Sequence, residues 1–495
     1  MAFTNRLIRA RHAAGLVPAV TIGALLAATP LAAQQRPAVP PTVPTLPPAT
    51  PPMVRTELSE AQARRLAELI DRDSVAQGLR EKDLPRATSL DRDALVGAAL
   101  DHARAVHAGR LDVSDFQPEW GIRPQPYDPL PGFAEAVRRD RLAAWIASLP
   151  PPYAGYDTLV AGLARYRSIA GSGGWTALVP GPELKLGATG ARVAALRKRL
   201  AVEDTALDGS GDRFDAPLGE AVRRAQRRYG LNPTGAAGAQ TVAALNVPVA
   251  DRVRQIMANM ERWRWLPSEI QKNRVQVNIA AAVLTVFEGD APVMSMKAVT
   301  GRPGDETPML VSQIHSIVIN PPWNVPSSIA TKELWPKERA KPGYLKRNGF
   351  RVIDTGDGGK RLQQSSENSA LGKFKFDFDN NFSVYLHDTP AQAGFARFDR
   401  LSSHGCVRLE KPADLAKLLL KTTPDWPAPT IDATVTAGKT VRAKVADPVA
   451  VYLLYWTAFA NGAGQVSFRA DPYKWDGTLA TKIEARSARQ ALASR

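Results

Sequence analysis

The residues with the clearest chemical potential are one cysteine and two histidines. Cys406 is the only cysteine in 495 residues, and it stands in the segment SHGCVR (403–408). A second histidine, His387, lies upstream in a chain that has only six histidines. A thiol with imidazoles close by is the pattern of a nucleophile and its general base. The sequence therefore predicts covalent catalysis by Cys406.

Two other roles for this cysteine are open from the pattern alone. A lone cysteine is often an inert, buried hydrophobic residue, and His404, Cys406 and a distant histidine could supply three zinc ligands. However, no second cysteine and no CxxC or HExxH motif is present. On an extended segment His404 and Cys406 would point to the same face, and Gly405 between them would let a substrate approach the backbone. We therefore favour a reactive thiol and expect no metal ion and no cofactor.

The composition bounds what the rest of the chain can be. A length of 495 residues predicts roughly two to four domains with cores of their own. The formal net charge of +16 fits either an arginine-rich solvated surface or attraction to an anionic polymer. RNP signatures and basic motifs interleaved with aromatic residues are absent, which argues against nucleic acid as the partner.

Residues 1–33 have the features of an export signal. Three arginines form a basic start, an alanine-rich apolar stretch follows at 13–28, and small residues then place cleavage near Gln34. Pro18 and the short apolar core argue against a retained anchor, although an uncleaved one stays open. No later stretch is long and apolar enough to span a bilayer. An exported chain with one cysteine cannot form an internal disulfide, which strengthens the reactive-thiol interpretation.

The next three segments predict supporting structure and carry no catalytic constellation of their own. Residues 34–55 are rich in proline and predict an extended, semi-rigid linker. Over 56–178, apolar residues recur at helical spacing, which predicts an all-α domain. Residues 179–247 predict a compact unit of three short helices, for which a generic helical spacer is the alternative.

Strand-like patterns predict a mostly β domain over residues 248–438. Apolar and polar residues alternate from 274 to 279, further β runs follow up to residue 319, and 382–387 alternates in the same way. Within this domain, 321–370 is a long polar insertion with glycine and proline, which predicts a lid, with a disordered surface insertion as the alternative. Residues 439–495 are expected to pack on the helical or the β domain.

The motifs around these residues resemble two known families. His387, fifteen further residues and then SHGC resemble the signature of the L,D-transpeptidase (YkuD-type) catalytic domain. Arg408 stands where asparagine is usual, a departure common in the long exported branch of that family. The chain looks like that branch from about 56 to 480, through VTGRPGDETPML, VINPPWNVPSSIATKELWP, PGYLKRNGF, LGKFKF, YLHDTPAQAGFARFDRLSSHGCVRL and VYLLYWTAFANGAGQVSFRADPY. LKLGATGARVAALRKRL and AVRRAQRRYGLNPTGAAGAQTVAALN resemble the peptidoglycan-binding domain family.

The resemblance implies a fold class and a setting. It implies an α+β multidomain protein, with a mostly β L,D-transpeptidase catalytic domain, an inserted capping lid, an all-α scaffold and a small three-helix peptidoglycan-binding domain. The protein would be a wall-associated periplasmic enzyme of peptidoglycan biosynthesis, cell-wall organisation and cell shape. Its partners would be peptidoglycan stem peptides and glycan strands. Other cell-wall synthesis enzymes are further candidate partners, and nucleic acid and a stable membrane span are not expected.

The resemblance also implies a reaction. Cys406 would attack the L-centre carbonyl of a meso-diaminopimelate (mDAP) residue in a tetrapeptide stem and expel the terminal D-alanine, while His387 takes the thiol proton. Backbone N–H groups at Gly405 and Cys406 would hold the oxyanion. Asp388 would help to orient His387, although the family often uses a backbone carbonyl, and His404 would position the substrate. The amine of a second stem would then resolve the thioester into a 3-3 (mDAP–mDAP) cross-link, and a carbapenem should acylate the same thiol.

Seven residues are expected to contact the substrate. Arg302 and Arg408 are candidates for stem carboxylates because a guanidinium binds a carboxylate in bidentate fashion, although both could equally be surface arginines. Trp323, Asn324 and Tyr344 would line the lid side. The full set is Ser403, Arg408, Tyr385, Arg302, Trp323, Asn324 and Tyr344.

Three alternative functions stay open from the sequence. Water could resolve the thioester, which would make the enzyme an L,D-carboxypeptidase. The same acyl-enzyme could attach envelope proteins to peptidoglycan. The chain could also be a non-catalytic structural protein that binds the wall, although the intact His387 and Cys406 pair argues against this.

Overall fold

The computed structural model describes residues 57–79, 86–356 and 358–493. The predicted export signal (1–33) and the proline-rich linker (34–55) lie outside these residues. In the part of the chain that is described, no helix combines the length and the apolar composition needed to cross a membrane.

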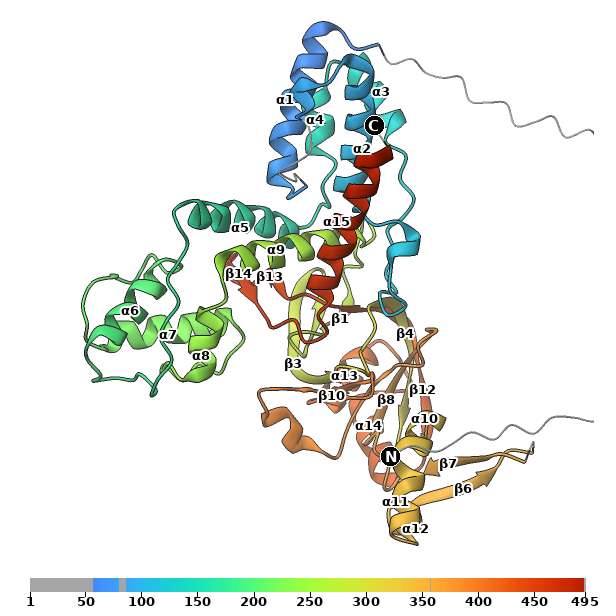
Figure 1. The fold of residues 1–495 in the computed structure, drawn as a ribbon. Coiled ribbons are helices and arrows are strands. Elements are labelled where there is room, and N and C mark those ends of the chain that lie inside the picture. The colour runs from blue at the N-terminus through green and yellow to red at the C-terminus, as the bar shows by residue number, and fades with distance from the viewer. Residues whose placement is uncertain (1–56, 80–85, 357, 494–495) are drawn as a thin grey trace, which may run out of the picture. The chain divides into compact units, whose positions relative to one another are not determined.

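Four helices near the start of the described chain pack around a hydrophobic core of their own (Figure 1). The first begins at a capping box in which the Ser59 side chain accepts from the Gln62 N–H and Gln62 reaches back to the Ser59 N–H. The second begins at Asp91, whose side chain accepts from the Ala94 N–H. The helices are α1 (Glu60–Ala76), α2 (Arg92–Ala108), α3 (Leu130–Arg138) and α4 (Leu142–Ala147).

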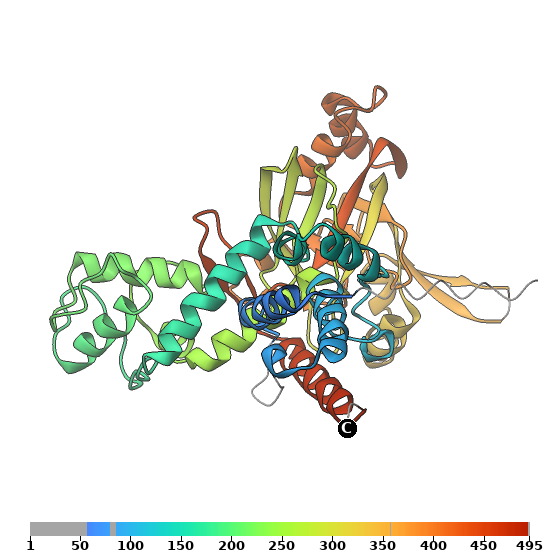
Figure 2. The ribbon, with the colours of Figure 1, turned by 90° about the horizontal axis from the view of Figure 1, so that it is seen from above.

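A long helix, α5 (Ala154–Gly171), then leads into a three-helix module. The module contains α6 (Ala191–Ala201), α7 (Ala216–Arg228) and α8 (Ala239–Leu245), drawn in green as one group (Figure 2). Its buried residues belong to the same hydrophobic cluster as residues of α5 and of the β sheet. The module is therefore not an independent domain on a flexible linker, because its hydrophobic core is continuous with that of its neighbours.

The module is joined to α5 by the carboxylate of Glu203, which is 3 % exposed. This carboxylate accepts hydrogen bonds from the hydroxyls of Tyr166 and Tyr229 at 2.5 Å each and from Nη1 of Arg199 at 2.8 Å. Burial by itself would raise the pKa of Glu203, but the guanidiniums of Arg199 and Arg228 and the two tyrosine hydroxyls hold this pKa below its ordinary value. Glu203 is therefore ionised inside the protein.

Helix α9 (Val249–Arg264) connects the helical domain to the C-terminal end of the chain. Its buried Glu261 accepts from Nη1 of Arg264 at 2.9 Å and from the backbone N–H of Arg110, which follows α2. Nη1 of Arg262 donates to Asp476 at 2.5 Å, and Asp476 lies in α15 (Trp475–Ala493). Through such contacts the described residues group into one compact unit.

A nine-stranded mixed sheet forms the catalytic part, in the order β10-β3-β11-β9-β8-β4-β12-β1-β2. Because β2 also pairs with β3, the sheet closes on itself. Several of its strands have one buried face, as in β1, where Val275 and Val277 are buried. The strands are β1 (Arg274–Asn278), β2 (Val283–Glu288), β3 (Ala291–Gly301), β4 (Leu310–Ile319), β8 (Phe374–Phe378), β9 (Leu386–His387), β10 (Leu401–Ser403), β11 (Val407–Leu409) and β12 (Val441–Leu454).

Two features of this sheet differ from the sequence-based expectation. The strand predicted over 382–387 is reduced to the two residues of β9, because Ser383 has a φ of +56°, which an extended strand does not accommodate. Strand β12 lies between β4 and β1, so the sheet continues beyond residue 438, where the catalytic domain was expected to end. The reason is that the apolar run from Val449 to Leu454 can be buried on both sides only in the middle of a sheet.

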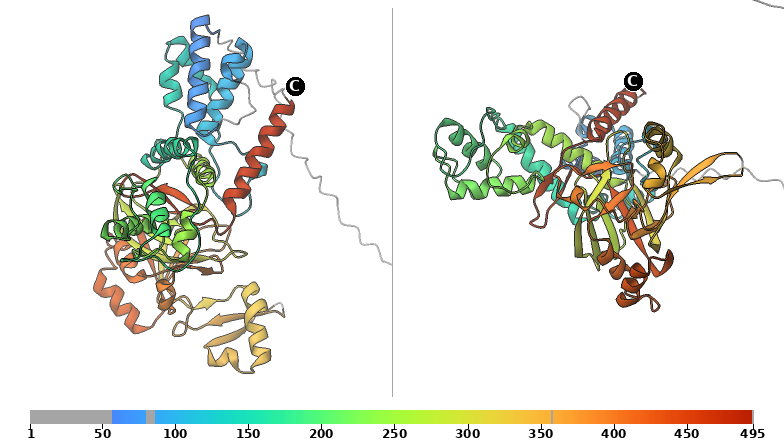
Figure 3. Two further views of the ribbon diagram at one scale, coloured as in Figure 1. Left: turned by 60° about the vertical axis from the view of Figure 1, so that its left-hand side comes forward. Right: turned by 90° about the horizontal axis from the view of Figure 1, so that it is seen from below.

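The described residues of the insertion at 321–370 form a separate group of helices and strands, drawn in yellow and light orange (Figure 3), with a small core of their own. A three-stranded sheet in the order β5-β7-β6 packs with short helices around Leu334, Leu345 and Leu362. Its elements are β5 (Trp323–Asn324), α10 (Ser327–Ile329), a π-helical turn (Ala330–Leu334), α11 (Trp335–Ala340), α12 (Tyr344–Arg347), β6 (Phe350–Asp354) and β7 (Lys360–Gln364).

The buried Glu203 leads to a prediction about stability. Glu203→Ala should lower the free energy of unfolding by about 3–5 kcal/mol, because it leaves the Arg199 guanidinium buried without its anion. Chemical unfolding followed by tryptophan fluorescence measures this, since Arg199 lies 3.8 Å from the ring centroid of Trp175. The matched control is Glu220→Ala, which removes an exposed pair with Arg223 and should cost at most about 1 kcal/mol. Equal losses in both variants would contradict the prediction.

The same carboxylate should make stability depend on pH in a defined direction. Because the folded pKa of Glu203 lies below the unfolded value of about 4.3, its contribution is fully present above that value. The contribution is lost as the pH falls through the folded pKa. The stability difference between the wild type and Glu203→Gln should therefore shrink with acidification.

Candidate active site

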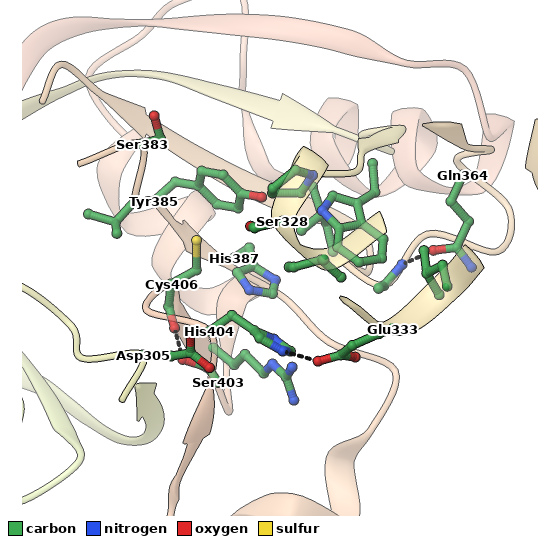
Figure 4. Close-up of a pocket in the computed structure, with 18 of the residues that line it drawn as sticks. Asp305, Ser328, Glu333, Gln364, Ser383, Tyr385, His387, Ser403, His404 and Cys406 are labelled. Atoms are coloured by element: carbon green, nitrogen blue, oxygen red, sulfur yellow. Dashed lines mark hydrogen bonds and ion pairs between the residues drawn. The ribbon is translucent and has the colours of Figure 1, made fainter. Parts of the chain in front are cut away.

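A cavity of about 610 Å³ lies between the sheet and the insertion (Figure 4). Gly405, Asp388 and Asn324 are the three predicted site residues that do not line it. The nine that do are Cys406, His387, His404, Ser403, Arg408, Tyr385, Arg302, Trp323 and Tyr344.

Cys406 and His387 are brought together by a short parallel ladder. Strand β11 pairs with β9, with Val407 opposite Leu386 and Arg408 opposite His387. Cys406 directly precedes β11, so its side chain reaches the cavity next to the His387 ring (Figure 4). Two segments separated by a loop in the sequence thus supply a thiol and an imidazole to one space.

The backbone around Cys406 is a tight turn closed by Ser403. Gly405 has a φ of +106°, a conformation that favours glycine. The Ser403 hydroxyl donates to the carbonyl oxygen of Cys406 at 2.5 Å and accepts from the Gly405 N–H at 3.2 Å. The Gly405 N–H, which was expected to bind an oxyanion, is therefore already engaged in this structure. Ser403 itself is only 1 % exposed, so it shapes the turn as well as lining the cavity.

The turn is also held from behind by residues that the sequence did not indicate. Thr307 Oγ1 donates to the carbonyl oxygen of Gly405 at 2.7 Å, and the Gly301 N–H donates to Thr307 Oγ1 at 2.8 Å. The hydroxyl of Tyr473 donates to the carbonyl oxygen of Gly301 at 2.6 Å. The position of the turn that carries Cys406 thus depends on a residue of the C-terminal segment.

Burial raises the pKa of the Cys406 thiol above its ordinary value. The backbone N–H and the side chain of Tyr385 act in the opposite direction as hydrogen-bond donors, followed by the charges of Lys375 and Arg408. Burial also raises the pKa of Tyr385, so its hydroxyl keeps its proton and stays a donor. The Lys375 ammonium lies 4.6 Å from the centroid of the Tyr385 ring. The resting cysteine is therefore a protonated thiol beside groups that favour the thiolate.

His387 is buried and neutral. Burial first, and then the positive charges of Arg408 and Lys375, lower its pKa to about 3, although backbone carbonyls oppose the shift. The strand register explains this effect, because Lys375 on β8 and Arg408 on β11 flank His387 on either side of β9. A neutral imidazole has a free nitrogen that can accept a proton at neutral pH.

The main-chain carbonyl of Asp388 lies 2.5 Å from Nδ1 of His387 and so orients the ring. The carboxylate of Asp388, which was a candidate for that role, accepts instead from the backbone N–H groups of Lys373 and Thr389 at 2.6 Å each. In this structure the orienting group is therefore the backbone of Asp388 rather than its side chain.

The two arginines proposed to bind stem carboxylates have different surroundings. Arg302 is compensated, with Nε 2.7 Å from Asp305 and Nη2 3.7 Å from Glu333. Among the residues that the structure describes, Arg408 has no ion pair with a carboxylate, and its buried Nε has no hydrogen-bond partner. Arg408 is therefore a cation of the cavity beside Cys406 that has no carboxylate partner among the described residues.

The insertion contacts the turn at residues 403–406 through His404. Nε2 of His404 lies 2.6 Å from Glu333 in the π-helical turn, a contact that sequence patterns did not reveal. Trp323 and Tyr344 line the cavity from the insertion. Asn324 lies outside the cavity lining, where its side-chain oxygen accepts from Gln363 at 2.8 Å.

Over residues 57–79, 86–356 and 358–493, no group of three or more His, Cys, Asp or Glu side chains could hold a metal ion.

Three parts of the chain match known protein families. Residues 272–441 match the family described as the L,D-transpeptidase catalytic domain (YkuD). The sheet and its insertion are thus similar to an L,D-transpeptidase catalytic domain. Residues 189–245 match the family described as "Putative peptidoglycan binding domain", and residues 55–163 match the family described as "Scaffold domain".

Individual relatives are more distant. A Haemophilus influenzae protein named "Putative L,D-transpeptidase" is 29 % identical over 239 residues, which cover 45 % of this chain and 48 % of that protein. The chain thus spans about half the length of this relative. An L,D-transpeptidase structure from Xylanimonas cellulosilytica is 18 % identical, covers 56 % of this chain and all of that chain, and has a TM-score of 0.20. One from Stackebrandtia nassauensis is 14 % identical, covers 56 % and 97 %, and has a TM-score of 0.23.

The contact between Tyr385 and the thiol can be tested by alkylation. Tyr385→Phe should raise the pKa of Cys406 further, because it removes a donor that favours the thiolate, and should slow iodoacetamide labelling about threefold to tenfold at a fixed pH near 8. Tyr344→Phe removes a hydroxyl from the same cavity and should leave the labelling rate unchanged. If Tyr385→Phe were labelled as fast as the wild type over the whole pH profile, the hydroxyl would not stabilise the thiolate.

Proposed function

We propose that this protein is a periplasmic L,D-transpeptidase that joins peptidoglycan stems through mDAP–mDAP cross-links and a thioester on Cys406. One observation supports the proposal above all others. A thiol, a neutral buried imidazole and a guanidinium without a carboxylate partner face a single cavity beneath an ordered insertion. These groups are a nucleophile, a base and an anchor for an anionic peptide.

In the first step, Cys406 attacks the carbonyl at the L-centre of mDAP in a donor stem. The thiol proton passes to His387 as the carbon–sulfur bond forms, and the imidazolium returns a proton to the departing amine of D-alanine. The backbone N–H of Cys406 and the hydroxyl of Tyr385 are the donors proposed for the oxyanion, because the N–H of Gly405 is bonded to Ser403.

Arg408 links substrate binding to the strength of the base. Its positive charge is the second-largest cause of the low pKa of His387, after burial. A stem carboxylate bound to Arg408 would cancel much of that charge and so raise the pKa of His387. The base would then accept the proton more readily when a substrate is in place than when the cavity is empty.

In the second step, an acceptor must reach the thioester before water does. The amine of a second stem attacks the thioester, His387 takes its proton, and the Cys406 thiol is released. We propose that the insertion acts as a lid that excludes water, held against the catalytic turn by the contact of Glu333 with His404. If water enters instead, the same acyl-enzyme gives an L,D-carboxypeptidase.

The deciding experiment is to incubate the full chain with purified disaccharide-tetrapeptide and identify the products by mass. A cross-linked dimer that has lost one D-alanine is the expected product. Tripeptide monomers alone would assign carboxypeptidase activity in place of transpeptidation. Cys406→Ala should abolish the product and also the covalent adduct with a carbapenem, and an adduct on that variant would end the thiol mechanism.

The two histidines should differ in importance. His387→Ala should lower turnover at least about a hundredfold, because it removes the proposed general base. His404→Ala removes only a contact with the insertion and should lose less than about tenfold, mostly through a higher KM. Steady-state rates of D-alanine release measure both variants, and the reverse ranking would move the role of base to His404.

A further inference from the structure

A second cleft, of about 800 Å³, lies where three segments of the chain meet. Helix α5 contributes Arg165, and the module contributes residues around α7. The third side is the hairpin of β13 (Ala458–Ala460) and β14 (Val466–Phe468). No residue that lines this cleft also lines the cavity at Cys406.

The cleft is strongly basic after internal pairing is counted. Five arginines and two acidic residues line it. Arg224 is paired with Asp204 at 2.8 Å, and Arg228 lies 3.9 Å from the buried Glu203. Three arginines are then left without a carboxylate partner among the described residues, namely Arg165, Arg227 and Arg469.

Two of these guanidiniums are placed by backbone contacts rather than by anions. Arg165 Nη2 donates to the carbonyl oxygen of Glu203 at 2.7 Å, and Arg469 Nη1 donates to that of Phe468 at 2.6 Å. Arg227 is exposed at the edge of the cleft. Main-chain carbonyls fix the direction of Arg165 and Arg469 and leave their full positive charges facing the cleft.

Arg469 shows how closely the fold accommodates this charge. Burial lowers its pKa to about 10, and Arg400 adds repulsion. Its side chain lies against Gly230, where a Cβ atom would come within 2.5 Å of the Arg469 side chain. Burying a guanidinium without an anion costs free energy of folding. An anionic ligand bound in the cleft would offset this cost.

We propose that this cleft binds carboxylates of peptidoglycan peptide stems, as a wall-binding site distinct from the cavity at Cys406. This inference rests on the proposed function for the identity of the polymer. Planar guanidiniums match carboxylates in bidentate geometry. The amide and hydroxyl side chains of Asn461, Gln465 and Ser467 beside them suit the peptide groups of a stem.

The site is composite, so it belongs to the assembled chain and not to the module alone. Buried Glu203, which joins α5 to the module, also provides the backbone carbonyl that orients Arg165. A stem held here stays attached to the enzyme while another part of the same polymer is free to enter the cavity at Cys406, which raises its effective concentration there.

The test is co-sedimentation of the full chain with purified sacculi. Arg227→Glu should weaken binding at least about tenfold, because it replaces a carboxylate-binding cation with a repelling anion. Arg213→Glu is the matched control, since Arg213 is an exposed arginine of the same module that does not line the cleft. Arg213→Glu should bind as the wild type does. Equal losses in the two variants would overturn the proposal in favour of a general charge effect.

Chemical treatment of the sacculi separates the ligand classes. Amidation of the free carboxylates should lower wild-type binding to the level of Arg227→Glu, and binding that resists amidation would overturn the proposal. Acid extraction of phosphate-bearing polymers should leave binding unchanged, and a loss at this step would assign the cleft to phosphate instead. Sedimentation needs no turnover, so a chain that forms no cross-links would refute the proposed function without deciding this one.

Discussion

The arrangement of the site depends on the short parallel ladder between β9 and β11. A ladder of so few residues cannot hold by itself, and it persists because β8 and β3 pair on its two outer sides. The same register that brings Cys406 next to His387 places Lys375 and Arg408 on either side of the imidazole. The register of these strands therefore determines both the positions of the thiol and imidazole and the charges around them. The strand pairing that brings the thiol next to the imidazole also keeps the imidazole neutral and places two positive charges that favour ionisation of the thiol.

The sequence predicted those parts of the molecule that are encoded locally. Alternation of apolar residues indicated the early strands, and the sequence also indicated His387 and Cys406, which the structure places in one cavity. The C-terminal strand β12 was missed because its position in the middle of the sheet depends on pairing with β1 and β4, which no local pattern contains. Glu333 was missed for a similar reason, since it meets His404 only after the insertion folds back on the core.

Residue type alone also did not distinguish the roles of two arginines in the site. Arg302 and Arg408 look equivalent in the sequence, yet the first is neutralised by acidic neighbours and the second is not. The difference arises from which strands and turns surround each guanidinium. For the same reason the carboxylate of Asp388 looked suited to orient His387, whereas the adjacent carbonyl is the group in position. The role of a polar side chain depends on the groups that it contacts, and the tertiary fold determines those contacts.

The place of β12 in the sheet has a consequence for the timing of activity. A polypeptide is made from its N-terminus, so Cys406 emerges before the strand that must be inserted between β4 and β1. Pairing of β1 with β12 closes a very long loop and is expected to form late in folding. Tyr473, which is hydrogen-bonded behind the turn that carries Cys406, emerges later still. The turn that carries Cys406 is therefore expected to reach its final position only late in folding.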